Sequence, residues 1–157
     1  MYDAMAYKLE VLTLPVHDID RALSFYARQL GFALDVDYHP AGNFRVVQLT
    51  PPGSACSIQI GVGLTDASPG SSRTTYLVVT DIEAAHRELT ARGVNVSAIL
   101  HKSPIDDWQG GTQPGVDPQR RDYASLANFA DPDGNTWILQ EVGYQWPGAR
   151  SGSEPRP

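Results

Sequence analysis

The sequence predicts an α+β fold built from two tandem βαβββ modules. One motif, Val-x-Asp-Ile-acid-x-Ala, begins at Val16 and again at Val79. After each copy, apolar residues recur at helical spacing up to a glycine, Gly31 or Gly93, and apolar strands follow. Because each half is too small to bury a comfortable core by itself, the two modules are expected to pack into one unit.

In the first module, the helix has the clearer signals. Asp18 is a plausible N-cap, and an apolar stripe that includes Ile19, Ala22 and Tyr26 leads to Gly31, where the helix is expected to stop. The predicted elements are a strand over 9–16, a helix over 17–31, and strands over 32–38, 44–50 and 56–62.

In the second module, the helix is predicted to begin with a capping box formed by Thr80 and Glu83. A polar linker over 64–73 precedes this module. The predicted elements are a strand over 74–79, a helix over 80–93, and strands over 94–100, 123–130 and 135–142. The turn DPDG at 131–134 separates the last two strands.

Composition excludes several classes of function. The 157 residues suit one domain, and the net charge of −6 comes without a cluster of Lys or Arg, so no nucleic-acid partner is expected. Cys56 is the single cysteine, which rules out an internal disulfide. No apolar stretch approaches the length of about 20 residues that crosses a membrane. The N-terminal residues lack the basic and apolar regions of a signal peptide, so a cytoplasmic location is expected.

A long polar segment, 101–123, lies between two predicted strands. Segments of this length are commonly lids or binding loops. Trp108 in its middle is interpreted as a ring that covers a ligand, and the alternative is an anchor that pins the loop to the body. His101 lies at a strand end and is the candidate acid or base near neutral pH.

Taken together, DIDRALSFYARQLGF near the start and FADPDGNTWILQE near the end resemble segments of the vicinal oxygen chelate (VOC) superfamily. This superfamily contains glyoxalases, dioxygenases and bleomycin-resistance proteins. The resemblance covers 7–143 as a single domain, with module one at about 7–63 and module two at about 73–143. The tail, 144–157, is expected to be disordered. The resemblance implies sheets that curl round a shared cavity, and a homodimer, because modules can pair across subunits as well as within a chain.

In the enzymes of this superfamily, the resemblance implies a divalent metal held by His, Gln or Glu from four strands. Carried over one position at a time, these ligands fall on Val11, Gln59, Thr74 and Ile138. Val11 and Ile138 have no donor atom, and the other two side chains are neutral. Because a cation needs several anionic or imidazole donors to replace its water shell, neither a metal nor another cofactor is expected.

The register of the strands decides which side chains face the cavity. A shift of one residue would turn Glu10 or Glu141 inward. Trp137 and Leu139 make the better pair for the helix-facing side, so the neighbouring Ile138 is expected to line the cavity.

The expected cavity lining is apolar with a few hydrogen-bonding groups, which suits a small organic ligand. Gln59 and Gln140 are placed to fix a carbonyl or hydroxyl group, or alternatively to hydrogen-bond each other. Tyr76 is placed to stack on an aromatic ring. The ligand-binding residues predicted are Val11, Thr13, Gln59, Thr74, Tyr76, Trp108, Ile138 and Gln140, and Ser57 completes the lining.

Three functions follow as hypotheses, and the sequence leaves open whether the protein is an enzyme. The favoured one is a metal-free protein that sequesters a hydrophobic or aromatic compound, in the manner of bleomycin-resistance proteins, which would confer antibiotic resistance. The alternative is a lyase or oxidoreductase of the glyoxalase or dioxygenase type, which uses a metal or relies on His101 and Tyr76. The third is a partner-binding module whose cavity is filled by Trp108 and its loop.

Overall fold

A computed structural model describes residues 4–148 of the chain, and it contains two βαβββ-type modules. The first module consists of β1 (Val11–Thr13), α1 (Ile19–Ser24), η1 (Phe25–Gln29), β2 (Ala33–Tyr38), β3 (Arg45–Thr50) and β4 (Ser57–Val62). The second consists of β5 (Thr75–Val79), α2 (Ile82–Ala91), β6 (Leu100–Lys102), β7 (Thr112–Pro114), β8 (Ser125–Ala130) and β9 (Thr136–Glu141). The predicted α+β fold is confirmed.

Each module forms its own sheet. The strand order is β1-β4-β3-β2 in the first sheet and β5-β9-β8-β6-β7 in the second. In both sheets the opening strand pairs in parallel with the closing strand of the same module, and the remaining pairs are antiparallel. The two sheets therefore repeat one topology, to which the second module adds the short strand β7.

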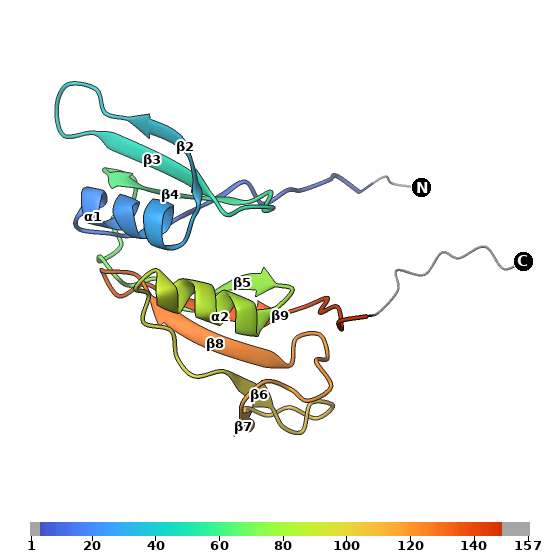
Figure 1. The fold of residues 1–157 in the computed structure, drawn as a ribbon. Coiled ribbons are helices and arrows are strands. Elements are labelled where there is room, and N and C mark those ends of the chain that lie inside the picture. Colours follow the sequence, from blue (N-terminus) through green and yellow to red (C-terminus); the bar gives the residue numbers. More distant parts are fainter. Residues whose placement is uncertain (1–3, 149–157) are drawn as a thin grey trace, which may run out of the picture.

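The hydrophobic core lies between the two sheets and includes both helices (Figure 1). Buried side chains from each sheet belong to one cluster: Val47, Leu49, Ile58 and Ile60 from the first, and Ala127, Phe129, Trp137 and Leu139 from the second. Because side chains alternate across a strand, the intervening residues of each sheet face away from this core. The outer faces of the two sheets therefore point away from each other.

This arrangement corrects the position expected for the cavity. The resemblance implied a cavity between the two modules of one chain. In the structure, that space is occupied by α1, α2 and the core side chains (Figure 1). The surfaces that were expected to curl round a shared cavity form two separate outer faces.

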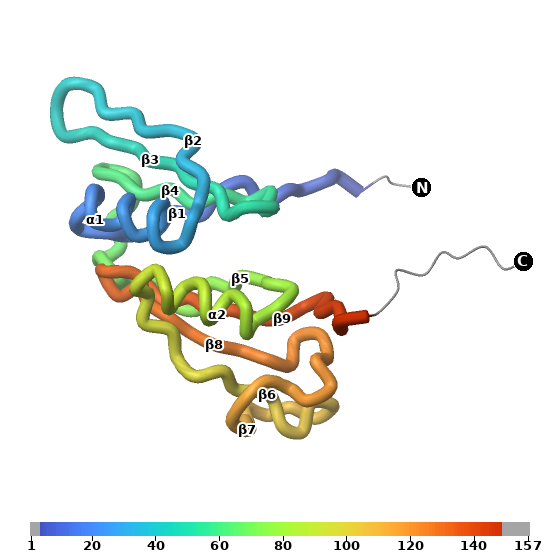
Figure 2. The backbone as a smooth tube through the Cα atoms, in the orientation of Figure 1, coloured from blue at the N-terminus to red at the C-terminus, as the bar shows by residue number. Residues whose placement is uncertain are grey.

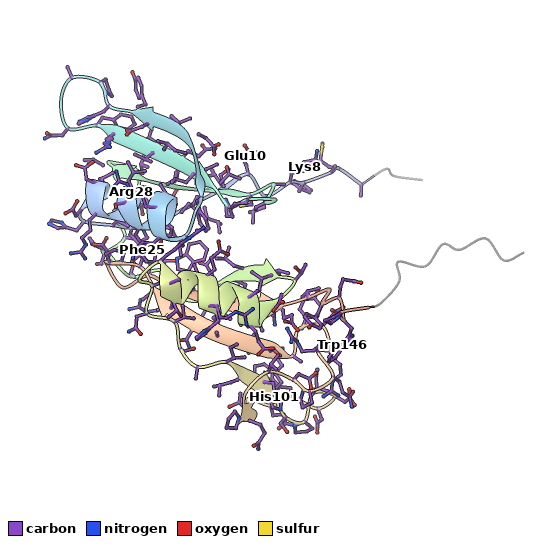
Figure 3. All side chains as sticks on the ribbon, viewed as in Figure 1. Lys8, Glu10, Phe25, Arg28, His101 and Trp146 are labelled. Atoms are coloured by element: carbon purple, nitrogen blue, oxygen red, sulfur yellow. The ribbon has the colours of Figure 1, made fainter. Side chains whose placement is uncertain are left out.

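Aromatic side chains join the modules. Tyr26 of η1 lies with its ring 5.8 Å from that of Trp137 in β9, and Phe25 lies 6.2 Å from Phe129 in β8. Phe25 points into the space between the modules (Figure 3). The helix stripe predicted from 3.6-residue spacing thus packs on the core face of the other module.

The helix ends differ in detail from the predictions. Asp18 is the N-cap of α1, as expected, and its carboxylate accepts from the Arg21 backbone N–H at 3.0 Å. The N-cap of α2 is Asp81 and not Thr80, because the Asp81 carboxylate accepts from Ala84. The second half of the first helix is a π-helix, Phe25–Gln29, which spacing did not predict.

The predicted strand over 94–100 is present only at its end, as β6. Val94 is nevertheless buried, and Val96 packs against the core. The polar segment 101–123 is not a single loop, because it contributes β6 and β7, which pair with each other. Apolar alternation here indicated burial and not strand pairing.

The chain enters and leaves on the same side of the molecule. The segment before β1 and the segment after β9 both extend outward there (Figure 2). Of the tail predicted over 144–157, Tyr144 lies beneath the guanidinium of Arg120, and residues 149–157 lie outside the described residues. No helix within residues 4–148 is long and apolar enough to cross a membrane.

Candidate functional site

The outer face of the first sheet is called here the first outer face. Pairing of β1 with β4 places Val11 beside Ser57 and Thr13 beside Gln59, and pairing of β3 with β4 adds Gln48 beside Gln59. Its members include Val11, Thr13, Val36, Val46, Gln48, Thr50, Ser57 and Gln59. Apart from Asp35, which is described below, this surface consists of apolar, hydroxyl and amide groups.

The outer face of the second sheet is called the second outer face. Parallel pairing places Tyr76 beside Ile138 and Val78 beside Gln140. Antiparallel pairing with β8 adds Asn128 beside Ile138 and Leu126 beside Gln140. Its members are Tyr76, Val78, Leu126, Asn128, Ile138 and Gln140. Trp137 and Leu139 point into the core at 1% and 2% exposure, as the sequence analysis expected.

The structure therefore divides the predicted ligand-binding residues into two groups. Val11, Thr13 and Gln59 share the first outer face, and Tyr76, Ile138 and Gln140 share the second. Within one chain, the core separates these groups.

One alternative predicted from the sequence was that Gln59 and Gln140 hydrogen-bond each other. The structure shows that they do not. The Gln59 amide donates to the Thr13 hydroxyl at 2.7 Å, and the Gln140 amide donates to the Tyr123 carbonyl at 3.2 Å. In each side chain this leaves the amide oxygen available as an acceptor. The two outer faces thus each present an ordered acceptor beside apolar groups.

The other two predicted ligand-binding residues, Thr74 and Trp108, lie away from these groups or at their edge. Thr74 immediately precedes β5, is exposed, and has a φ of 55°. Trp108 donates to the Gly111 carbonyl at 2.8 Å, and the Lys102 ammonium lies 4.5 Å from its ring. These contacts hold Trp108 to residues of its own loop and to β6.

His101 is paired with Ser125, so it alternates with Leu100 and lies on the opposite side of the second sheet from Leu126 and Tyr76. Its Nδ1 lies 2.8 Å from the Gly115 carbonyl oxygen. Figure 3 shows His101 at the end of the second module that lies farther from the first module. The structure does not bring His101 together with Tyr76.

Glu141, one of the two acids that a one-residue shift would have turned into the expected cavity, is fully buried on the core side. It accepts from the Arg120 guanidinium at 2.8 and 2.6 Å and from the Ile82 backbone N–H at 2.9 Å. Glu10 is exposed and precedes β1. Neither carboxylate belongs to an outer face.

The residues at the four family metal positions do not fit a metal ion. Val11 and Ile138 supply no donor, and Gln59 and Thr74 supply neutral oxygens. Among residues 4–148, there is also no group of three or more His, Cys, Asp or Glu side chains that could hold a metal ion. A divalent cation prefers several anionic or imidazole ligands, and these positions offer none.

Sequence reasoning missed Asp35. Leu34 pairs with Leu49, but Val36 pairs with Gln48, so Asp35 is an extra residue in β2. Such a bulge redirects a side chain. The Thr50 hydroxyl donates to the Asp35 carboxylate and lies 2.7 Å from the Ser57 hydroxyl. No pattern in the sequence signals this, because a bulge depends on the pairing between strands.

A hollow of about 430 Å³ opens between the modules on the core side. Its lining includes Leu30, Phe32, Leu89 and Phe129. None of the residues predicted to bind a ligand lines it. Of the residues that make up the two outer faces, Val78 alone also lines this hollow.

Comparison with known proteins agrees with this fold. The family model described as "Glyoxalase/Bleomycin resistance protein/Dioxygenase superfamily" matches residues 8–139. A glyoxalase/bleomycin resistance protein from Streptomyces sp. CB03234 is 28% identical with a TM-score of 0.63, over 85% of this chain and all of that one. TnmS3, an antibiotic binding protein from the same organism, is 28% identical with a TM-score of 0.66, over 89% of this chain and 98% of that one.

A relative of uncharacterised function from Shewanella frigidimarina (strain NCIMB 400) is 26% identical over 144 residues, which is 87% of this chain and 94% of the relative. The repeated modules, the sheet topology and the match of the family model agree with one another. The chain therefore belongs to the Glyoxalase/Bleomycin resistance protein/Dioxygenase superfamily.

Proposed function

We propose that the protein binds and sequesters a small apolar or aromatic organic compound, such as an antibiotic, without a metal ion. The binding site forms when the first outer face of one copy packs opposite the second outer face of another copy. A symmetric homodimer contains two such sites. The observation that carries the proposal is that both outer faces combine apolar side chains with ordered amide oxygens and carry no set of metal ligands.

Exposed apolar side chains support the pairing of two copies. Tyr38 and Val36 are 55% and 42% exposed in the first sheet, and Tyr76 and Val78 are 53% and 57% exposed in the second. Gathered apolar surface of this kind on a water-exposed sheet is typical of an interaction site. A second copy offers the complementary face, because each chain carries both.

The segment before β1 supports the same interpretation. Met5, Tyr7 and Leu9 are 75%, 90% and 66% exposed and alternate with smaller or charged residues. This is the pattern of a strand with one apolar face. A second copy would cover that face and shield it from water.

The likeness to TnmS3, an antibiotic binding protein, supports a small organic ligand. A metal-dependent glyoxalase or dioxygenase reaction is not favoured, because the donor set at the four family positions is neutral or apolar. A metal-free reaction that uses His101 and Tyr76 is not favoured either, since these side chains lie on opposite sides of the second sheet. Stoichiometric Zn, Ni, Mn or Fe in protein purified without chelators would contradict the proposal.

The direct test is isothermal titration calorimetry of the protein with a panel of aromatic antibiotics and other aromatic natural products. At least one compound is expected to bind with a micromolar dissociation constant or better, about −8 kcal/mol. Light scattering of the same sample is expected to give twice the chain mass of 17.1 kDa. A monomer, or a panel in which nothing binds more tightly than about 1 mM, would refute the proposed site.

A further inference from the structure

The first outer face contains a hydrogen-bonded chain of three side chains. The bulge in β2 brings the Asp35 carboxylate to Thr50 at the end of β3, and Thr50 in turn lies beside Ser57 at the start of β4. Ser57 is 6% exposed, whereas Asp35 is exposed. The three hydrogen-bonded side chains thus lead from the solvent-exposed edge of the sheet toward the strand that carries Gln59.

The donor and acceptor in each hydrogen bond of this network follow from the carboxylate at its end, Asp35. An ionised carboxylate only accepts hydrogen bonds, so the Thr50 hydroxyl must donate its one hydrogen to Asp35. The Thr50 oxygen is then left to accept, and the Ser57 hydroxyl donates to it at 2.7 Å. Ser57 has no hydrogen left, and its oxygen can only accept from a further group.

The neighbouring glutamines also offer acceptors. The Gln59 amide donates one of its two N–H hydrogens to Thr13, and its oxygen is left as an acceptor. Across the proposed interface, the Gln140 amide donates one N–H hydrogen to the Tyr123 carbonyl, and its oxygen is likewise left as an acceptor. Each amide keeps a second N–H hydrogen, so the Ser57 oxygen is the group of the three that can only accept.

We infer that Asp35, through Thr50 and Ser57, makes the site selective for aromatic ligands that carry a hydrogen-bond donor, such as a phenolic hydroxyl or an aromatic amine. Asp35 is thus a positioning residue that fixes the polarity of Ser57 without contacting the ring of the ligand. The inference rests on the proposed function, because it assigns the ligand class of the same site. A ligand with acceptors only would leave the Ser57 oxygen unsatisfied, which is costly in a buried position.

The test compares two probes of the same shape, 2-naphthol and 2-methoxynaphthalene, at pH 7. Only the first can donate a hydrogen bond. The wild-type protein is expected to bind 2-naphthol about tenfold more tightly. Thr50→Val removes the oxygen to which Ser57 donates. In Asp35→Asn, the new amide can donate to Thr50. In both variants the Ser57 hydrogen becomes free to turn toward the probe. The preference is then expected to fall to about twofold or less.

Asp37→Asn is the matched control. It removes the same charge from the same strand, but Asp37 is bound by Arg45 at 2.9 Å, on the core side of the sheet. The tenfold preference is expected to persist in this variant, and circular dichroism checks that all variants are folded. Equal binding of the two probes to the wild type, or a preference that survives Thr50→Val, overturns the inference alone. If neither probe binds, the inference is overturned, and the proposed function is contradicted as well only if no compound of the antibiotic panel binds.

Discussion

Arg120 brings three carboxylates together at the edge of the second module. It lies 2.6 Å from Glu141, 2.8 Å from Glu83 and 3.3 Å from Asp81, with its guanidinium 3.5 Å from the centre of the Tyr144 ring. The fully buried Glu141 depends on this pairing. An unpaired buried carboxylate is strongly unfavourable, so Arg120 is expected to contribute to folding and not to ligand binding.

Arg120→Ala is therefore expected to lower the free energy of unfolding by about 3–5 kcal/mol, because Glu141 is left as an uncompensated buried charge. Urea unfolding at pH 7 measures this. Arg92→Ala is the control, since Arg92 makes a half-exposed ion pair with Glu88, and its loss should cost less than about 1 kcal/mol. A loss from Arg120→Ala no larger than that of the control would contradict this role.

A second single-residue prediction concerns acid stability. Hydrogen bonds from the Arg121 side chain lower the pKa of the buried Asp117 to about 2. Because the folded-state pKa lies below the unfolded value of 3.8, this carboxylate stabilises the protein above about pH 4, and the contribution is lost as the pH falls toward 2.

Asp117→Asn should therefore reduce the change in unfolding free energy between pH 4 and pH 2 by about 2 kcal/mol relative to the wild type. Thermal unfolding across that range provides the measurement. Asp66→Asn serves as the control, since Asp66 is an exposed acid in the linker. Identical pH dependence in the wild type and Asp117→Asn would rule the prediction out.

At the scale of secondary-structure elements, a buried network joins η1 of the first module to the DPDG turn of the second. The Tyr26 hydroxyl donates to Asp131 at 2.7 Å and accepts from the Trp137 indole at 3.0 Å. Asp131 also accepts from the Asn135 side chain at 2.8 Å, and Asn135 donates to the Pro15 carbonyl at 2.9 Å. Burial and the nearby Asp131 both raise the pKa of Tyr26, so the hydroxyl keeps its proton.

Tyr26→Phe should cost about 1–3 kcal/mol of unfolding free energy, because the Trp137 N–H loses its acceptor in a buried position. Tyr76→Phe is the matched control, since that ring is half-exposed. Chemical denaturation of both variants, followed by Trp fluorescence, gives the comparison. Equal stability of Tyr26→Phe and the wild type would show that the network does not hold the modules together.

The elements also show what the sequence alone can predict. The repeat, the helix stripe and the alternation of Trp137 with Ile138 predicted the modules and the side on which each strand residue lies, because these patterns are local. The N-cap at Asp81 is a local contact with Ala84, and Asp81 occupies the same place in the repeat as Asp18. By contrast, the bulge at Asp35 and the burial of Glu141 by Arg120 depend on which segments pair or pack. Local periodicity carries no signal of those contacts.

At the scale of the whole molecule, the structure corrects the position that the resemblance implied for the cavity. Resemblance led to a cavity between the two modules, but nothing in the residue pattern distinguishes a module that pairs within its chain from one that pairs with another copy. Tyr26, Phe25 and Trp137 decide it, because they pack as core between the modules, and the hollow that remains there is lined by none of the predicted ligand-binding residues. The candidate residues are therefore left on two faces that need a second copy to meet.

Complementation between subunits tests this central claim most directly. Gln59→Trp obstructs the first outer face and Ile138→Trp obstructs the second, so each homodimer should lose binding of the tightest compound in the panel. A heterodimer of the two variants, purified with two different tags, has one site with both obstructions and one with neither. Calorimetry is expected to find one ligand bound per heterodimer at wild-type affinity. A heterodimer that binds none would contradict the account, because every site would then draw both faces from a single chain.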